Sequence, residues 1–186
     1  MEVNYVIEGK DLKKKFKGFE LDIPNLHIPK GYATALIGEN GAGKSTLLNM
    51  LAGIRLDHKG TLRYFDEFDE KERENGKHKE RLGYIGTGNF YLPQWKVGQV
   101  EEVNTLLFEG FDKDKFHMLC KELAVFGEKA FDSRKKVTEL SDGSRMKLML
   151  ANIFARDTDC LLLDEPASPL DRVRSEERFS RNAETD

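Results

Sequence analysis

A glycine-rich segment carries the residue types that hold phosphate groups. Residues 38–46 fit the pattern G-x-x-x-x-G-K-[ST] and lie between an apolar strand-like run and a helix-like run. The glycines let the backbone curl so that successive N–H groups point inward at phosphate oxygens. The segment comprises Gly38, Glu39, Asn40, Gly41, Ala42, Gly43, Lys44, Ser45 and Thr46. It predicts a binding site for a nucleoside triphosphate; the alternative is a glycine-rich turn with a purely structural role.

Two side chains of this segment have a defined chemistry toward such a ligand. Lys44 would reach the β- and γ-phosphates, and the hydroxyl of Ser45 would bind Mg²⁺. The helix expected to begin at Ser45 would add the positive end of its dipole to the same anion site. We therefore expect Mg²⁺ as the partner of the triphosphate.

A second set of candidate residues follows an apolar run near the end of the chain. Residues 160–163 read as a buried strand, and Asp164 and Glu165 follow it directly. An open parallel sheet places its ligand chemistry at the carboxyl ends of its strands. Asp164 would hold Mg²⁺ through water, and Glu165 would polarise the water that attacks the γ-phosphate. Many strands end in solvated acids, so this pair alone is weak evidence for a site. Together with the glycine-rich segment upstream it is strong evidence.

Between these two segments lies a helix start that could bind a second anion. Ser141 is placed to cap a helix whose apolar residues follow at near-helical spacing. One chain does not need two γ-phosphate sites. We therefore expect Ser141 and Gly143 to serve a nucleotide held by another copy of the chain, in a head-to-tail dimer. The alternative is an ordinary serine-capped helix.

The elements that must position these residues are readable from the pattern of apolar side chains. Residues 5–28 predict short strands, with Pro24, Pro29 and Gly31 as turns. Residues 33–37 predict a short strand buried in a parallel sheet, and residues 45–51 a helix that stops near Gly53.

The middle of the chain predicts a charged connection followed by helices. Residues 67–81 are dominated by charge and favour a solvated connection. Beyond them, apolar residues at helical spacing predict two core-facing helices, the second capped by Asp112 or Asp114 and ended by Gly127. We expect these helices to form an inserted lobe over residues 99–139.

Composition narrows the class of protein. The chain has 186 residues and a net charge of −3, so it shows no overall electrostatic footprint for nucleic acid, which is not an expected partner. Cys120 and Cys160 lack metal-ligand spacing and predict buried, reduced thiols. No apolar run approaches the length of a membrane span, so any membrane role is expected to come through a partner.

These residues together resemble the nucleotide-binding domain of ATP-binding cassette (ABC) transporters, from about Tyr5 to Asp171. In the terms of that family, residues 38–46 are the Walker A loop, 140–144 the signature, 161–164 the Walker B strand and 167–171 the D-loop. The resemblance implies an α/β fold: a P-loop NTPase with a RecA-like core sheet, an N-terminal antiparallel β lobe and an inserted helical lobe. It also implies that residues 1–186 form a single nucleotide-binding domain.

The resemblance adds two roles and raises one question. It implies that Phe16 stacks on adenine, although Phe16 could equally be a core aromatic of the strand lobe. It implies that the helical lobe docks on a membrane-spanning permease. Where the family carries a glutamine that touches Mg²⁺ and the attacking water, this chain has Thr87. Thr87 can still offer a hydroxyl to metal or water, and Gln94 lies seven residues further on.

The chain also departs from the family pattern at the signature and at its end. Asp142 stands in place of a glycine and Ser144 in place of a glutamine, so an extra carboxylate lies near the predicted phosphate site. After Asp171 the family continues with a core strand and a histidine that contacts the γ-phosphate, whereas residues 172–186 are almost wholly polar. We expect a C-terminally shortened domain with an altered or disordered tail, lower stability and dependence on a partner.

Three functions follow from these observations. The first is an ATP-binding and ATP-hydrolysing subunit that acts as a dimer at the cytoplasmic, inner face of the plasma membrane and powers transport through a separate permease. The second is a truncated ATP-binding module with little or no hydrolysis, because the histidine is absent and Thr87 replaces glutamine. A third, an ABC protein of translation or repair, is disfavoured because such chains usually carry two cassettes or long inserts.

Overall fold

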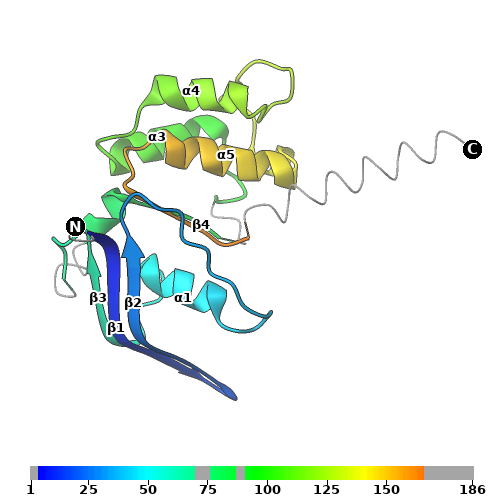
Figure 1. Ribbon diagram of the computed structural model, residues 1–186. Coiled ribbons are helices and arrows are strands. Elements are labelled where there is room, and N and C mark those ends of the chain that lie inside the picture. The colour runs from blue at the N-terminus through cyan, green and yellow to red at the C-terminus, as the bar shows by residue number, and fades with distance from the viewer. Residues whose placement is uncertain (1–3, 70–75, 87–90, 166–186) are drawn as a thin grey trace, which may run out of the picture. The chain divides into compact units, whose positions relative to one another are not determined.

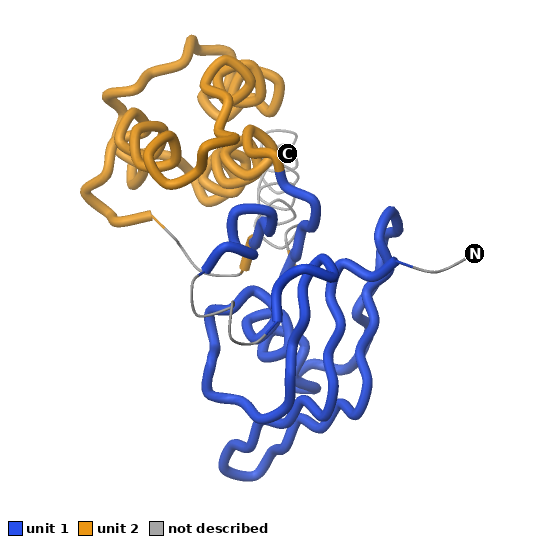
Figure 2. The backbone as a smooth tube through the Cα atoms, turned by 90° about the vertical axis from the view of Figure 1, so that its left-hand side faces the viewer, with its two compact units in different colours: residues 1–84, 158–164 blue, residues 85–157, 165–186 orange. Residues whose placement is uncertain are grey.

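A computed structural model describes residues 4–69, 76–86 and 91–165. The chain divides into two compact units (Figure 2). The first comprises residues 1–84 and 158–164, and the second comprises residues 85–157 and 165–186. The predicted helical lobe at 99–139 falls within the second unit.

The first unit is built on a three-stranded antiparallel sheet. Its strands are β1 (Tyr5–Phe16), β2 (Phe19–Pro29) and β3 (Lys59–Tyr64), in the order β2-β1-β3 (Figure 1). Gly18, with a φ of 85°, makes the tight turn between β1 and β2. The predicted strands of residues 5–28 are thus confirmed as one long hairpin.

Pro24 is not a turn residue, because it lies inside β2. The register pairs Lys10 with Asn25 and Leu12 with Ile23, so Pro24 falls between two regular pairs. A proline removes one backbone donor and is tolerated where a strand has a neighbour on one side only. β2 is such an edge strand, which explains why the sequence pattern misplaced a turn here.

Helix α1 (Lys44–Leu51) packs on this sheet and organises the core of the first unit. The two short strands β4 (Leu82–Ile85) and β5 (Cys160–Leu163) are hydrogen-bonded neighbours and contribute to the same core. The buried apolar residues of this core are Val6, Ile7, Leu12, Leu47, Met50, Leu51, Ala52, Leu62, Tyr64, Leu82, Cys160 and Leu162. The predicted helix after the glycine-rich segment and the predicted strand at 160–163 are confirmed.

The predicted buried strand at residues 33–37 is wrong. These residues have no regular secondary structure and are exposed; Ile37 is 90% accessible. A strand forms only where a neighbouring backbone satisfies its N–H and C=O groups. In the described part of the chain, β1 to β3 form one sheet and β4 pairs with β5, and neither sheet includes this run. The apolar composition of the run was therefore insufficient to make it a strand.

The charged connection at 67–81 is less solvated than its composition suggests. Residues Lys77–Glu80 form a short 3-10 helix, η1, in which His78 is fully buried. The His78 ring stacks on Tyr64, with the ring centroids 4.3 Å apart. Arg81 forms ion pairs with Glu67 at 2.9 Å and Asp159 at 2.5 Å. The end of the connection is thus tied to the core of the first unit.

The described part of the second unit is helical. It contains α3 (Val97–Leu107), α4 (Lys113–Glu122), a 3-10 turn η2 (Val137–Glu139) and α5 (Asp142–Phe154). Of the two predicted caps for α4, Asp112 is the N-cap, because its carboxylate accepts a hydrogen bond from the Lys115 amide at 2.9 Å. Gly127 does not end α4; the helix stops at Glu122, and the chain turns through Ala124, which has a φ of 51°.

Part of the predicted apolar stripe of α3 is exposed. Val100 is fully buried, but Leu106 and Leu107 are 84% and 64% accessible. These two residues lie in the last turn of α3. The helical spacing was correct, whereas the expectation that the whole stripe faces a core was wrong.

Both cysteines are buried and free, as predicted. Burial raises the pKa of the Cys120 thiol to about 12 and that of Cys160 to about 11. None of the described helices combines the length and the apolar composition that crossing a membrane requires.

We predict that Gly60→Ala lowers the free energy of unfolding by more than about 2 kcal/mol, since it adds overpacking to the cost of a left-handed backbone. Gly60 has a φ of 88°, and a Cβ there would lie 2.4 Å from the carbonyl oxygen of Asp11. Gly18→Ala is the control, with a similar φ of 85° and open space around it, and should cost about 1 kcal/mol. Urea unfolding measures both; equal losses would contradict the steric argument.

Candidate nucleotide-binding site

The glycine-rich segment folds as a loop that leads directly into α1. Gly41 and Gly43 have φ angles of 86° and 92°, in the left-handed region that glycine enters without steric cost. A Cβ on Gly43 would also lie only 2.9 Å from the ring of Phe19. The amide of Ala42 donates to the carbonyl oxygen of Glu39 at 3.2 Å, which closes the turn. The loop therefore requires glycine at Gly43, which the sequence pattern specifies, and at Gly41, which the pattern leaves open.

The Lys44 side chain turns back over this loop. Its Nζ atom donates hydrogen bonds to the carbonyl oxygens of Gly38, at 2.7 Å, and Glu39, at 2.8 Å. An ammonium group has three donors and forms its strongest hydrogen bonds with charged oxygen acceptors. Phosphate oxygens in the loop would therefore compete well for Lys44.

The first turn of α1 is suited to an anion. Asn40 lies in the exposed turn before the helix, Ser45 is exposed in the first turn, and Thr46 is half-buried. No side chain caps this helix end, and its first turn contains no acidic residue. Its amide N–H groups and positive dipole end are thus unopposed by a carboxylate of the helix itself. The structure brings all nine residues of the predicted segment into one loop and one helical turn.

The two carboxylates after β5 differ in their surroundings. Asp164 is only 4% accessible, whereas Glu165 is exposed. Glu165 has a φ of 49°, in the left-handed region that costs a non-glycine residue about 1 kcal/mol. A sharp change of backbone direction therefore follows Asp164, and the two side chains do not share one environment.

Two residues that sequence reasoning missed join α1 to β4. The hydroxyl of Tyr84 donates a hydrogen bond to Oδ1 of Asn49 at 3.0 Å. Burial, and then the negative charge of Asp164, raise the pKa of Tyr84. The only sequence signal was the position of Asn49, four residues after Ser45 on the predicted helix.

Phe16 lies at the end of β1 and is half-buried. Its ring stacks on Phe19, with a centroid distance of 6.1 Å. Lys14 Nζ and Arg55 Cζ each lie 5.4 Å from the Phe16 centroid. Phe16 is not among the buried residues of the core, so a part of its ring is open to solvent.

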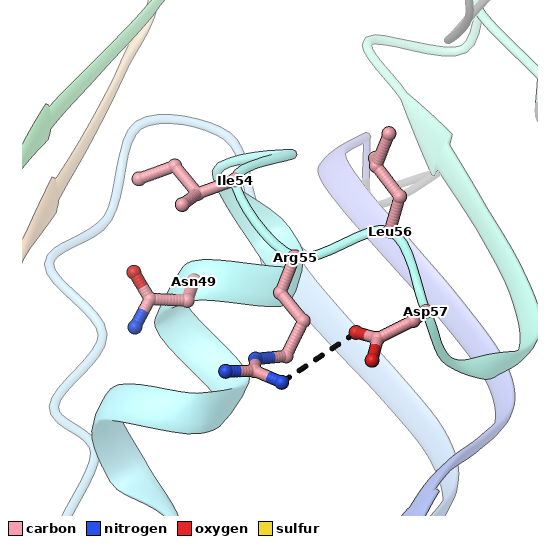
Figure 3. A pocket seen from close by; sticks show the side chains of 5 residues that line it. All are labelled: Asn49, Ile54, Arg55, Leu56 and Asp57. Atoms are coloured by element: carbon pink, nitrogen blue, oxygen red, sulfur yellow. Dashed lines mark ion pairs between the residues drawn. The ribbon is translucent and has the colours of Figure 1, made fainter.

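A pocket of about 400 Å³ opens beside the C-terminal half of α1. It is lined by Asn49, Ile54, Arg55, Leu56 and Asp57 (Figure 3). The guanidinium of Arg55 points toward Asp57 and pairs with it at 3.5 Å. Because Arg55 also lies over the Phe16 ring, one arginine connects this pocket with the aromatic residue predicted to stack on adenine.

The predicted second anion site is the N-terminus of α5. The Ser141 hydroxyl accepts a hydrogen bond from the Ser144 amide at 3.1 Å, so Ser141 is the N-cap as predicted. Gly143 is buried in the first turn. The carboxylate of Asp142 is paired with the guanidinium of Arg145 from the same helix. The extra carboxylate that departs from the family signature thus has its own counter-ion.

Some predicted residues cannot be joined to these sites. Thr87, the D-loop at 167–171 and the tail at 172–186 lie outside the described residues. Gln94 is exposed in a turn before α3. The glycine-rich loop belongs to the first unit and Ser141 to the second.

The fold of this chain is found in solved structures of ABC proteins. Two solved structures share the fold: an ATP-binding subunit of an ABC transporter (TM-score 0.72, 19% identity, covering 88% of this chain and 68% of that one) and a bacterial Atm1-family ABC exporter with ATP bound (TM-score 0.73, 19% identity, covering 97% and 32%). The fold is therefore that of a P-loop NTPase of the ABC class.

The sequence comparisons show family membership directly. A sequence model of the family described as ABC transporter matches residues 21–168. The lipoprotein-releasing system ATP-binding protein LolD of Francisella tularensis is 30% identical over 185 residues, covering 94% of this chain and 79% of LolD. The tungstate uptake system ATP-binding protein TupC of Peptoclostridium acidaminophilum is 31% identical, covering 89% and 74%. The chain belongs to the ABC transporter family, and it is an ATP-binding, ATP-hydrolysing subunit of that family.

We predict that Ser141→Ala destabilises α5 by about 1 kcal/mol, because the Ser144 amide loses its acceptor. Hydrogen exchange of the α5 amides measures the change. Ser144→Ala is the matched control: it removes a neighbouring hydroxyl and leaves that amide and its acceptor in place, and it should cost less than about 0.5 kcal/mol. Equal effects of the two substitutions would mean that Ser141 does not act as the cap.

Proposed function

We propose that the glycine-rich loop binds the triphosphate of ATP and that the residues around it hydrolyse the γ-phosphate. The observation that carries this proposal is the position of Lys44, whose ammonium already binds loop carbonyl oxygens over an uncapped helix start. On binding, Lys44 exchanges these carbonyls for β- and γ-phosphate oxygens. The amide N–H groups of the loop and of the first turn of α1 hold the remaining oxygens.

Two residues of the first unit also suit Mg²⁺. The Ser45 hydroxyl and the Asp164 carboxylate are hard oxygen donors, and Mg²⁺ is usually held by few protein ligands together with phosphate oxygens. Bound there, the ion would neutralise charge on the β- and γ-phosphates. The contribution of Thr87 stays a prediction.

Glu165 is proposed as the general base. Its exposed carboxylate follows directly after Asp164. It accepts a proton from water as the water oxygen bonds to the γ-phosphorus, and the bond from that phosphorus to the β–γ bridging oxygen breaks. Phe16 is proposed to stack on the adenine, which its partly open ring allows.

The N-terminus of α5 is proposed to complete the site of a second copy. Ser141 and Gly143 would approach the γ-phosphate held by the other chain's loop, with the positive dipole end of α5 behind them. The ion pair between Asp142 and Arg145 supports this proposal, because it offsets a carboxylate that would otherwise repel the phosphate.

The partner whose transport is coupled to ATP hydrolysis is proposed to be a separate membrane-spanning permease. The named relatives are ATP-binding proteins of lipoprotein-releasing and tungstate uptake systems. Leu106 and Leu107, exposed in the last turn of α3, supply apolar surface for such a contact in the second unit. The chain would then lie at the cytoplasmic face of the membrane, held by its partner.

We expect Lys44→Ala to weaken ATP binding at least tenfold, because a charge-assisted hydrogen bond contributes about 1.5–3 kcal/mol. Glu165→Gln should preserve binding and lower turnover about a hundredfold or more, as the loss of a general base does. Equilibrium binding and phosphate release with Mg²⁺-ATP measure the two effects. Lys17→Ala, in the exposed turn between β1 and β2, is the matched lysine control.

The same assay separates the two functions that the sequence left open. Turnover that both substitutions reduce supports the hydrolysing subunit. If the unmodified chain alone binds ATP but does not hydrolyse it, the proposed role of Glu165 is contradicted. The chain would then act as an ATP-binding module. Equal binding by the unmodified chain and Lys44→Ala would overturn the proposed site.

We expect the Glu165→Gln chain with Mg²⁺-ATP to form a dimer, which sedimentation velocity would detect. Adding Ser141→Arg should prevent dimerisation, because a long side chain would fill the space that the proposed γ-phosphate contact needs. Thr105→Arg, at an exposed position of α3, is the control for the added charge. A monomer that holds both ATP and Mg²⁺ would contradict the shared site.

A further inference from the structure

A hydrogen bond between two half-buried side chains joins α1 to β4. The Tyr84 hydroxyl donates to Oδ1 of Asn49 at 3.0 Å. Both residues belong to the first unit, and neither was selected by any sequence motif. The bond links the two elements at a defined separation, because a hydrogen bond has a preferred donor–acceptor distance.

The two elements that this hydrogen bond joins each lead to one of the two residues proposed to bind Mg²⁺. Asn49 lies four residues after Ser45, so the two share a face of α1 one turn apart. Tyr84 lies on β4, the hydrogen-bonded neighbour of β5, and Asp164 follows directly after the last residue of β5. The charge of Asp164 reaches the phenol, since it contributes to the raised pKa of Tyr84.

We propose that Tyr84 and Asn49 are positioning residues, which set the separation between the Ser45 hydroxyl and the Asp164 carboxylate. The inference rests on the proposed Mg²⁺-ATP site and deepens it. Mg²⁺ demands near-ideal octahedral geometry with ligands at about 2.0–2.1 Å, so a small shift of α1 against β5 is costly. Residues that orient metal ligands typically change metal affinity or activity by about 10–100-fold when they are lost.

A second tyrosine in the same unit provides a matched control. The Tyr64 hydroxyl donates to the carbonyl oxygen of Leu51 at 2.9 Å, at the opposite end of α1 from Ser45. Tyr64→Phe and Tyr84→Phe therefore each remove one hydroxyl that ties α1 to a strand. Of these two tyrosines, Tyr84 lies on the strand next to β5 and pairs with Asn49, one helical turn after Ser45.

The test measures the dissociation constant of a non-hydrolysable ATP analogue with Mg²⁺ and with EDTA. The ratio of the two constants reports the contribution of the metal and does not depend on turnover. In Tyr84→Phe we expect this ratio to fall about tenfold while binding in EDTA stays unchanged. Asn49→Ala should lower the ratio similarly, and the double variant should be no worse than either single one. Tyr64→Phe should leave the ratio unchanged, whatever it does to stability.

Other outcomes would overturn the inference. An unchanged ratio in Tyr84→Phe, or equal weakening with Mg²⁺ and with EDTA, would make the hydroxyl merely structural. An equal fall of the ratio in Tyr64→Phe would show that any loosening of α1 has the same effect. If the unmodified chain does not bind the analogue, or binds it no better than Lys44→Ala, the proposed nucleotide site itself fails.

Discussion

The first unit depends on helix α1 being held in one place, since α1 serves the core and the candidate site at once. Leu47, Met50 and Leu51 fill the core between the antiparallel sheet and the β4–β5 pair. The N-terminus of the same helix continues from the glycine-rich loop and presents its free amides. Packing therefore does more than stabilise the unit: it fixes the direction in which a helix start meets an anion.

Two tyrosine hydroxyls tie the C-terminal half of α1 to neighbouring strands. Tyr64 donates to the carbonyl oxygen of Leu51, and Tyr84 donates to the side chain of Asn49. Hydrophobic contacts are non-directional, so apolar packing alone leaves a helix free to shift along a sheet. Hydrogen bonds of defined length remove that freedom. The arrangement explains why two polar tyrosine oxygens lie in or beside an apolar core.

Several carboxylates of the described residues have a cationic partner close to a candidate site. Asp142 is paired with Arg145 on α5, and Asp57 with Lys14 and Arg55 next to Phe16. Such exposed pairs add little to stability, with a median of about 0–1 kcal/mol. Their effect on the candidate site is local: they offset a carboxylate at one helix start and place a guanidinium over an aromatic ring.

The residue pattern by itself determined where the phosphate chemistry of this chain is proposed. The left-handed loop needs glycine at Gly41 and Gly43, and an anion site needs Lys44 beside a helix start; such local requirements are written in consecutive residues. The strands within residues 5–28, a helix cap at Asp112 or Asp114 and the cap at Ser141 were predicted for the same reason.

Tertiary structure alone decided which apolar runs found a partner. Residues 33–37 have the composition of a buried strand, yet they pair with no strand in the described part of the chain, and Pro24 lies in a strand because β2 is at a sheet edge. The spacing of Asn49 from Ser45 did not indicate that its partner would be Tyr84, 35 residues away. Backbone pairing and side-chain contact depend on what lies opposite in space, and no window of consecutive residues contains that information.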